Sequence, residues 1–228
     1  HIQSENKQIL LECGLYQSCG STSDDYKINN GKLGFKPKEI DYIFLMHEHI
    51  DHIGKVPLLY AKGCTAKIIA PKGSFDIAKV LLLDSAYIMS RDADGLGKKS
   101  GKKVDPIFTA EDVENCLQYW TEYEIGEKVR LDKDVEFCFQ PSGHILNSAQ
   151  LELWIRNNNN IKKIGYTSDL GNNSVSNIYV NKFNPIEKCN LMIGECTYAD
   201  SMRSVSTKDR FKDLEKMESI RFLTKSVI

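Results

Sequence analysis

His47-Glu48-His49-Ile50-Asp51-His52 places three imidazoles and one carboxylate within six residues, in the pattern HxHxDH. The apolar run Tyr42–Met46 precedes this segment and predicts a buried strand. Ile53–Tyr60 follows it and predicts a loop that enters a short helix. The segment therefore lies where a strand ends and a helix begins.

The spacing of these polar residues predicts a metal site. His47 and His49 are two residues apart on extended backbone, so their side chains should point the same way. Asp51 and His52 fall in the turn that follows, so their side chains can face a second position next to the one that His47 and His49 face. Two divalent cations about 3.5–4 Å apart would suit this arrangement, as in hydrolytic two-metal sites. The alternative is a solvated His/Asp turn that binds nothing, because single motif matches do fail.

The composition bounds the class of protein. With 228 residues, the chain is long enough for one large domain or one and a half. The 30 basic and 31 acidic residues nearly balance, so global charge neither supports nor excludes a nucleic-acid partner. No apolar run of about 18 residues and no signal-peptide pattern is present, so we expect no membrane span. The chain starts at His1 rather than Met, and we expect that its native N-terminus has been removed.

The cysteines point to a reducing compartment. The chain has seven cysteines and no CxxC pair, so neither a disulfide framework nor a zinc finger is expected. Cys138, Cys189 and Cys196 lie in apolar, strand-like runs and are expected to be small core residues. This usage fits the cytosol, and the protein is expected to be cytoplasmic.

Apolar runs bounded by turn residues predict strands, and the order of these strands predicts an α/β fold. Some strands are consecutive and others are separated by helices, which favours two sheets covered by helices over one doubly wound sheet. Four asparagines at 157–160 predict a hairpin loop. The expected strands are Lys7–Glu12, Tyr42–Met46, Lys67–Ala70, Val135–Gln140, Gln150–Ile155, Lys162–Thr167 and Leu191–Glu195.

Helices are expected at Ser74–Ser90, at about Ala110–Tyr119 and at Lys208–Leu223. The second follows Thr109-Ala110-Glu111-Asp112, which resembles a capping box with Asp in place of Glu. The third has apolar residues at amphipathic spacing. Between the first two, Arg91–Lys103 is rich in Gly and Lys and predicts a solvated, mobile loop. The functional alternative for that segment is a basic lip that meets phosphates.

Two further side chains follow predicted strands and could complete the metal site. His144 lies in a turn marked by Pro141 and Gly143. A lone histidine there is usually a surface or hydrogen-bonded residue, but HxHxDH cannot close two metal shells alone, so we expect His144 to be a ligand. Asp169 is either a turn-forming residue close to Gly171 or a carboxylate that bridges two cations.

Three segments, taken in order and context, resemble the metallo-β-lactamase superfamily: HxHxDH, Ser142-Gly143-His144 and Thr167-Ser168-Asp169-Leu170-Gly171. Gly194–Asp200 resembles the E-[SC]-T-Y element of β-CASP nucleases, a branch that includes RNase J and the polyadenylation-factor endonuclease. Leu10–Leu15 resembles their opening LLDCG motif. The resemblance covers nearly the whole chain.

This resemblance implies an αββα metallo-β-lactamase sandwich, with the metals at one rim between the sheets. It implies a metallo-β-lactamase domain over residues 1–200 and the start of a β-CASP domain, or a linker helix, over 201–228. The chain then looks like an N-terminal fragment, truncated before the β-CASP domain and without two later histidines of the family. We therefore expect the chain by itself to bind metal poorly and to be inactive.

The resemblance also assigns roles to residues. A hydroxide shared by two zinc ions would attack the phosphorus in line. Asp51 would orient this nucleophile, and Glu195 would support a later histidine that acts on the leaving oxygen. The alternative for Glu195 is a strand-end side chain that faces solvent. Each zinc ion would have three ligands from this chain, namely His47, His49 and His144 for one, and Asp51, His52 and a bridging Asp169 for the other.

Two positions depart from the family's motifs. Glu12 stands where LLDCG has Asp, which lengthens a carboxylate behind the ligands and could shift their orientation. Asn147 replaces the usual Gly of the GHxxG turn. We expect both changes to be tolerated, the first with the greater risk to activity.

The leading hypothesis is a zinc-dependent phosphodiesterase that cleaves RNA, with single-stranded DNA as the alternative polymer. The rival is a hydrolase of a small thioester or lactone, similar to glyoxalase II, which would share the metal motif. The segment at Glu195 and the helix after it favour the nuclease. A third hypothesis is a non-catalytic RNA-binding or scaffold homologue, which would be expected to have lost ligands, whereas all six candidates are present.

Overall fold

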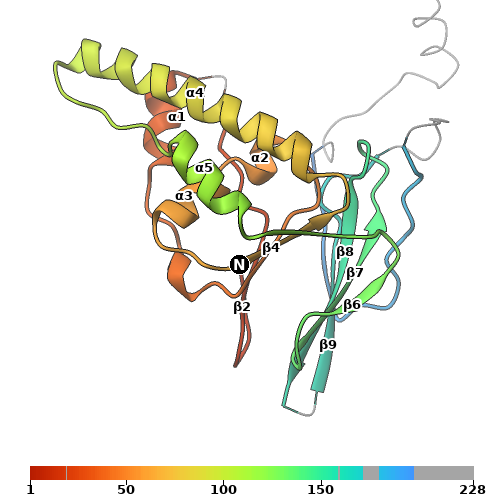
Figure 1. The fold of residues 1–228 in the computed structure, drawn as a ribbon. Helices are drawn as coiled ribbons and strands as arrows, with labels where there is room; N and C mark the ends of the chain where they lie inside the picture. Colours follow the sequence, from red (N-terminus) through yellow and green to blue (C-terminus); the bar gives the residue numbers. More distant parts are fainter. Residues whose placement is uncertain (19, 159, 172–179, 198–228) are drawn as a thin grey trace, which may run out of the picture.

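The computed structural model describes residues 1–18, 20–158, 160–171 and 180–197. These residues form two five-stranded sheets that pack face to face, with helices on the outer side of the first sheet (Figure 1). This α/β architecture is the one expected from the sequence, and within the described residues the helices cover the first sheet. The helix expected at Lys208–Leu223 lies outside the described residues, as does the expected domain boundary near residue 200.

The first sheet is mostly parallel, with the strand order β1-β2-β3-β4-β5. Only β1 runs antiparallel to its neighbour. The central β3 is buried on both faces, because Ile43 contacts the helices while Phe44 contacts the second sheet. A strand covered on both sides has no polar face, which explains its uninterrupted apolar run. The strands are β1 (Ile2–Gln3), β2 (Gln8–Leu11), β3 (Tyr42–Phe44), β4 (Lys67–Pro71) and β5 (Trp120–Tyr123).

The second sheet has the order β10-β9-β8-β7-β6 and is antiparallel except for the β9–β10 pair. Asn157 pairs with Asn160, which confirms the predicted hairpin. Phe137 meets Phe44 of the first sheet with ring centroids 5.2 Å apart, in the apolar layer between the sheets. The strands are β6 (Lys128–Arg130), β7 (Val135–Pro141), β8 (Ala149–Asn157), β9 (Asn160–Tyr166) and β10 (Leu191–Ile193).

Helices α3, α4 and α5 pack on the first sheet through a second apolar core, which includes Leu59, Leu82 and Val113. The predicted capping box is present, since the Thr109 and Asp112 side chains each bond the other residue's backbone N–H. No helix within the described residues combines the length and apolar character needed to cross a bilayer. The helices are α1 (Thr22–Asn29), α2 (Ile50–Ile53), α3 (Val56–Ala61), α4 (Phe75–Ser100) and α5 (Ala110–Leu117), with a 3₁₀ turn at Pro37–Glu39.

The prediction of a loop at Arg91–Lys103 was wrong, because α4 continues to Ser100. Ala93 is fully buried and extends the inward stripe of the helix by two turns. Gly97 sits where an added β-carbon would lie 3.0 Å from the Lys102 carbonyl oxygen, so its small size suits the returning chain. Gly101 ends the helix with φ of 65°, a left-handed cap that favours glycine.

The other strands and helices expected within the described residues were confirmed, with ends that differ by a few residues except at α4. The sequence did not reveal α1, whose only buried residue is Asn29, or the short strands β1, β5 and β6, which are too brief for a clear periodic signal. Cys138 is buried as expected, but Cys196 is exposed, so its assignment to the core was wrong. All six cysteines within the described residues are unpaired.

Candidate metal centre

The candidate residues come from strand ends that meet at one rim of the sandwich. Neighbouring β2 and β3 are parallel, so the segments after them leave the same edge of the first sheet. In the second sheet β7, β9 and β10 share one direction, because β7 and β9 are both antiparallel to β8 and β10 is parallel to β9. The segments that follow these five strands carry, in order, Glu12, His47–His52, His144, Asp169 and Glu195.

A close backbone crossing holds the HxHxDH turn in place. The Cys13 N–H donates to the His52 carbonyl at 2.8 Å, and the Leu15 N–H donates to the Ile50 carbonyl at 3.0 Å. Between them, a β-carbon on Gly14 would lie 1.5 Å from the Asp51 carbonyl oxygen. Only glycine fits at this crossing, which ties the segment after β2 to the segment after β3.

Three imidazole nitrogens converge on one point. Nε2 of His47 lies 3.1 Å from Nδ1 of His49, which in turn lies 3.2 Å from Nε2 of His144. Zinc–nitrogen bonds of 2.0–2.1 Å in a tetrahedron separate neighbouring nitrogens by about 3.3–3.4 Å. The observed spacings are close to that edge, so these residues fit a single zinc-sized ion. His47 and His49 point the same way, as their spacing in the sequence suggested.

Asp169 connects this trio to a second group of ligand-type side chains. Its Oδ2 lies 3.5 Å from Nε2 of His144 and 3.8 Å from Nε2 of His47. The same oxygen lies 3.4 Å from Nε2 of His52, which is 3.5 Å from Oδ2 of Asp51. One carboxylate oxygen therefore faces both groups, the position that a bridging ligand requires. The structure brings together all six residues singled out in the sequence.

Electrostatics favour neutral imidazoles at His47 and His144. Burial, reinforced by the neighbouring histidines, lowers the pKa of His47 to about 2. Burial also lowers the pKa of His144, although the Asp169 carboxylate opposes this shift. Burial alone would lower the pKa of His52, but its hydrogen bond to Glu12 and nearby carboxylates outweigh burial and raise that pKa. Neutral histidine is the form that binds metal, so His47 and His144 are prepared for a cation.

Glu12 is the centre of a hydrogen-bond network behind the ligands. Its Oε2 accepts from Nδ1 of His52 at 2.6 Å and from the Tyr166 hydroxyl at 2.5 Å. Its Oε1 accepts from the Ser168 hydroxyl at 2.8 Å. The bond to Nδ1 turns Nε2 of His52 toward Asp169. Carboxylates that do not bind the metal themselves orient metal-bound histidines in the same way. The roles of Tyr166 and Ser168 were not foreseen, because nothing local in the sequence connects them to Glu12.

Glu195 lies beside the ligands without joining them. Its Oε1 accepts from the Leu170 N–H at 2.6 Å, and its Oε2 accepts from the Thr197 hydroxyl at 2.6 Å. Burial would raise the pKa of Glu195, but the hydrogen bonds from Thr197 and Leu170 outweigh burial and lower it. Glu195 is exposed, and these hydrogen bonds hold its carboxylate one residue from Asp169.

Asn147, which departs from the GHxxG motif, adopts φ of 60°. Asparagine is among the non-glycine residues that tolerate this left-handed region. The turn that carries His144 therefore keeps the backbone conformation that a glycine at position 147 would allow.

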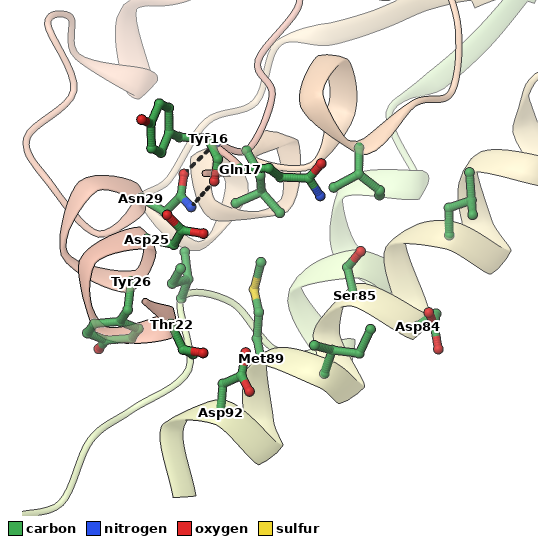
Figure 2. Close-up of a pocket in the computed structure, with 15 residues that line it drawn as sticks. Tyr16, Gln17, Thr22, Asp25, Tyr26, Asn29, Asp84, Ser85, Met89 and Asp92 are labelled. Carbon is green, nitrogen blue, oxygen red and sulfur yellow. Dashed lines mark hydrogen bonds between the residues drawn. The ribbon is translucent and has the colours of Figure 1, made fainter. Parts of the chain in front are cut away.

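A cavity of about 270 Å³ lies beside the metal centre, between α1, α2 and α4 (Figure 2). Ile50 of the HxHxDH turn contributes to its wall. The Asn29 amide is held by two 2.8 Å hydrogen bonds with the Tyr16 backbone. Among the described residues, three carboxylates line the cavity and no Lys, Arg or His does, so phosphate groups would be repelled from it. The carboxylates are those of Asp25, Asp84 and Asp92.

Residues 2–126, more than half of the chain, match the family model described as the metallo-beta-lactamase superfamily. The chain belongs to the metallo-beta-lactamase superfamily. The family resemblance is thereby confirmed, and the matched residues include HxHxDH. The two-sheet architecture agrees with this membership.

Two curated relatives of this chain have nucleic-acid functions in their names. A ribonuclease of Thermus thermophilus is 27% identical over 85% of this chain and 39% of its own length. The transcription termination factor FttA of Methanocaldococcus jannaschii is 23% identical over 75% of this chain and 24% of its own length. The chain thus spans well under half of these proteins. Among solved structures, MEM-A1 is a subclass B3 metallo-beta-lactamase isolated from a soil metagenome library. It matches this chain with a TM-score of 0.41 and 19% identity, and the match covers 72% of this chain and 54% of MEM-A1.

Proposed function

We propose that the protein is a cytoplasmic, zinc-dependent ribonuclease of the β-CASP branch. The observation that carries this proposal is the position of Asp169 Oδ2, which faces the three-histidine group and the His52 group at once. Such a donor set fits two neighbouring cations, the arrangement used to hydrolyse phosphodiesters. The relative from Thermus thermophilus, a ribonuclease by name, supports RNA as the substrate.

In this proposal some residues bind the metal ions, while Asp51 and Glu195 orient the reacting groups. When bound, the two ions would lower the pKa of a water molecule and neutralise charge that builds on the phosphate. The side chain of Asp51 is 58% exposed, so it can reach the substrate and orient the nucleophile. Glu195 would support an acid that protonates the leaving oxygen. The acidic cavity in Figure 2 is unsuited to phosphates, so we expect RNA to approach over the open rim instead.

The rival function is hydrolysis of a small thioester or lactone. The metal ligands alone do not separate the two reactions, because both use an activated water. The Glu195 segment favours the nuclease, since its carboxylate is fixed beside Asp169 although it reaches neither ligand group. A small-molecule hydrolase has no evident use for this second, fixed carboxylate.

The deciding experiment measures metal content and two activities on the full-length protein. Elemental analysis after gentle purification should find up to two zinc ions per chain. A labelled single-stranded RNA should be cleaved, while a glyoxalase-type thioester and a lactone should not. A protein that takes up neither zinc nor manganese would refute the metal centre. Thioester or lactone hydrolysis without RNA cleavage would establish the rival, and cleavage of single-stranded DNA alone would change the substrate.

A further inference from the structure

Ser168, directly before Asp169, adopts a backbone conformation that serine rarely takes. Its φ is 48°, in the left-handed region that favours glycine, and the residue is only 3% exposed. A strained conformation of this kind persists only where the surrounding contacts require it, and such residues cluster at functional sites. The contacts of its hydroxyl show what requires it here.

The Ser168 hydroxyl lies between a carboxylate and a candidate ligand. Its Oγ donates to Oε1 of Glu12 at 2.8 Å and lies 3.4 Å from Nδ1 of His47. The direct separation of His47 Nδ1 from Glu12 Oε1 is 3.8 Å, which is too long for a hydrogen bond. Because the single hydroxyl proton goes to the carboxylate, the oxygen can only accept from Nδ1–H of His47. The hydroxyl therefore connects His47 to Glu12.

The other oxygen of Glu12 accepts directly from Nδ1 of His52 at 2.6 Å. One carboxylate thus contacts a histidine from each of the two ligand groups, one directly and one through serine. In both rings a proton held on Nδ1 leaves the lone pair of Nε2 free to face the neighbouring ligands. The tautomer of a histidine is set in this way by the hydrogen bond of its other nitrogen.

We propose that Ser168 is a positioning residue that fixes the tautomer and orientation of His47, so that Glu12 orients ligands of both metals. The strained backbone places the hydroxyl between Glu12 and His47. This inference rests on the proposed metal-binding function, and it concerns ligand orientation rather than the identity of the substrate.

Two substitutions separate the hydroxyl from the backbone. Ser168→Gly and Ser168→Ala both remove Oγ, but only glycine accepts the left-handed backbone without strain. We expect both variants to bind zinc or cobalt(II) about 10-fold to 100-fold more weakly in chelator competition, the usual range for such outer contacts. We also expect the glycine variant to have a higher thermal midpoint than the alanine variant. A serine with a purely structural role would change the midpoint alone.

Lys188→Gly is a matched control. Lys188 has φ of 47°, is exposed and precedes β10, at the end of that strand away from the ligands. Its substitution should relieve the same backbone strain and leave metal affinity unchanged.

Unchanged affinity in both Ser168 variants would overturn the proposal. So would weak binding by the alanine variant with normal binding by the glycine variant, because backbone shape would then explain the effect. Metal uptake by wild type without RNA cleavage would refute the proposed ribonuclease and leave this inference standing. If wild type takes up no metal, the proposal is tested instead by ¹⁵N NMR, which reports the tautomer of each imidazole in the metal-free protein. We expect a single Nδ1–H tautomer of His47 that becomes mixed in both variants, and a mixed tautomer in wild type would refute the proposal.

Discussion

Gly171 lies so close to Gly143 that a β-carbon on Gly171 would stand 1.6 Å from the Gly143 carbonyl oxygen. The Gly171 N–H also donates to the Ser142 carbonyl at 3.0 Å. These two glycines belong to the loops that carry Asp169 and His144. Direct backbone packing therefore sets the separation between the candidate bridging carboxylate and the third histidine.

Gly171→Ala should force these two loops apart. We expect a loss of stability of about 1–3 kcal/mol, typical of overpacking, together with weaker metal binding. Thermal denaturation and metal titration would measure both effects. Gly34→Ala is the control, since an added β-carbon there meets no atom of the described part of the chain within 4 Å. Metal binding equal to wild type would show that the crossing does not position the ligands.

Asp169→Asn should remove the bridge while keeping the size of the side chain. An amide lacks the negative charge that two cations share, so we expect loss of bound metal and loss of RNA cleavage with little change in fold. Circular dichroism, elemental analysis and a cleavage assay on labelled RNA would be read together. Activity near wild type would return Asp169 to the role of a turn-forming residue.

Glu12→Gln should misorient His52. The variant loses the carboxylate that accepts hydrogen bonds from His52, Tyr166 and Ser168. The NH₂ group of the new amide would face at least one of these donors and could not accept its hydrogen bond. Outer contacts of this kind are worth about 10-fold to 100-fold in metal affinity. Tyr166→Phe is a matched control, because Tyr166 is not a candidate ligand and its substitution removes only one of the three donors to Glu12, so its effect on affinity should be smaller. Equal effects of the two variants would contradict this view of Glu12.

Glu195→Gln and Glu195→Ala should behave differently. Glutamine can still accept from the Leu170 N–H, so metal should stay bound while RNA cleavage falls, by at most the 10²–10⁴-fold typical of acid–base assistance. Alanine loses this anchor beside Asp169, so metal binding should weaken as well. An unaltered cleavage rate in the glutamine variant, with metal retained, would favour the alternative of a strand-end side chain that faces solvent and would weaken the β-CASP assignment.

The metal-free protein should lose stability as the pH falls below about 6.5. His47 has a pKa of about 2 in the folded chain against an ordinary value of 6.5, so in this window only the unfolded chain takes up its proton. His144 acts in the same direction, and His52, whose pKa is raised, acts in the opposite one. Urea denaturation at several pH values should show that the free energy of unfolding depends less steeply on pH in His47→Gln than in wild type. Identical slopes would exclude His47 as a source of this effect.

The sequence by itself determined the fold class, most strands and the types of donor at the rim. These features are local, because the alternation of His47 and His49 follows from extended backbone and each donor directly follows an apolar run. The same local logic failed at Arg91–Ser100, where glycines and lysines hide a buried stripe that only packing against the first sheet reveals.

Only the tertiary structure decided how the donors are oriented. Glu12 and Ser168 are 156 residues apart, and their hydrogen bond depends on two sheets meeting at one rim. The glycine crossing at Gly14 and the carboxylate shared by His47 and His52 have the same origin. Spacing along a chain indicates which atoms could bind a cation, whereas hydrogen bonds between distant segments favour one ring nitrogen of His47 and of His52 as the one that faces the neighbouring ligands.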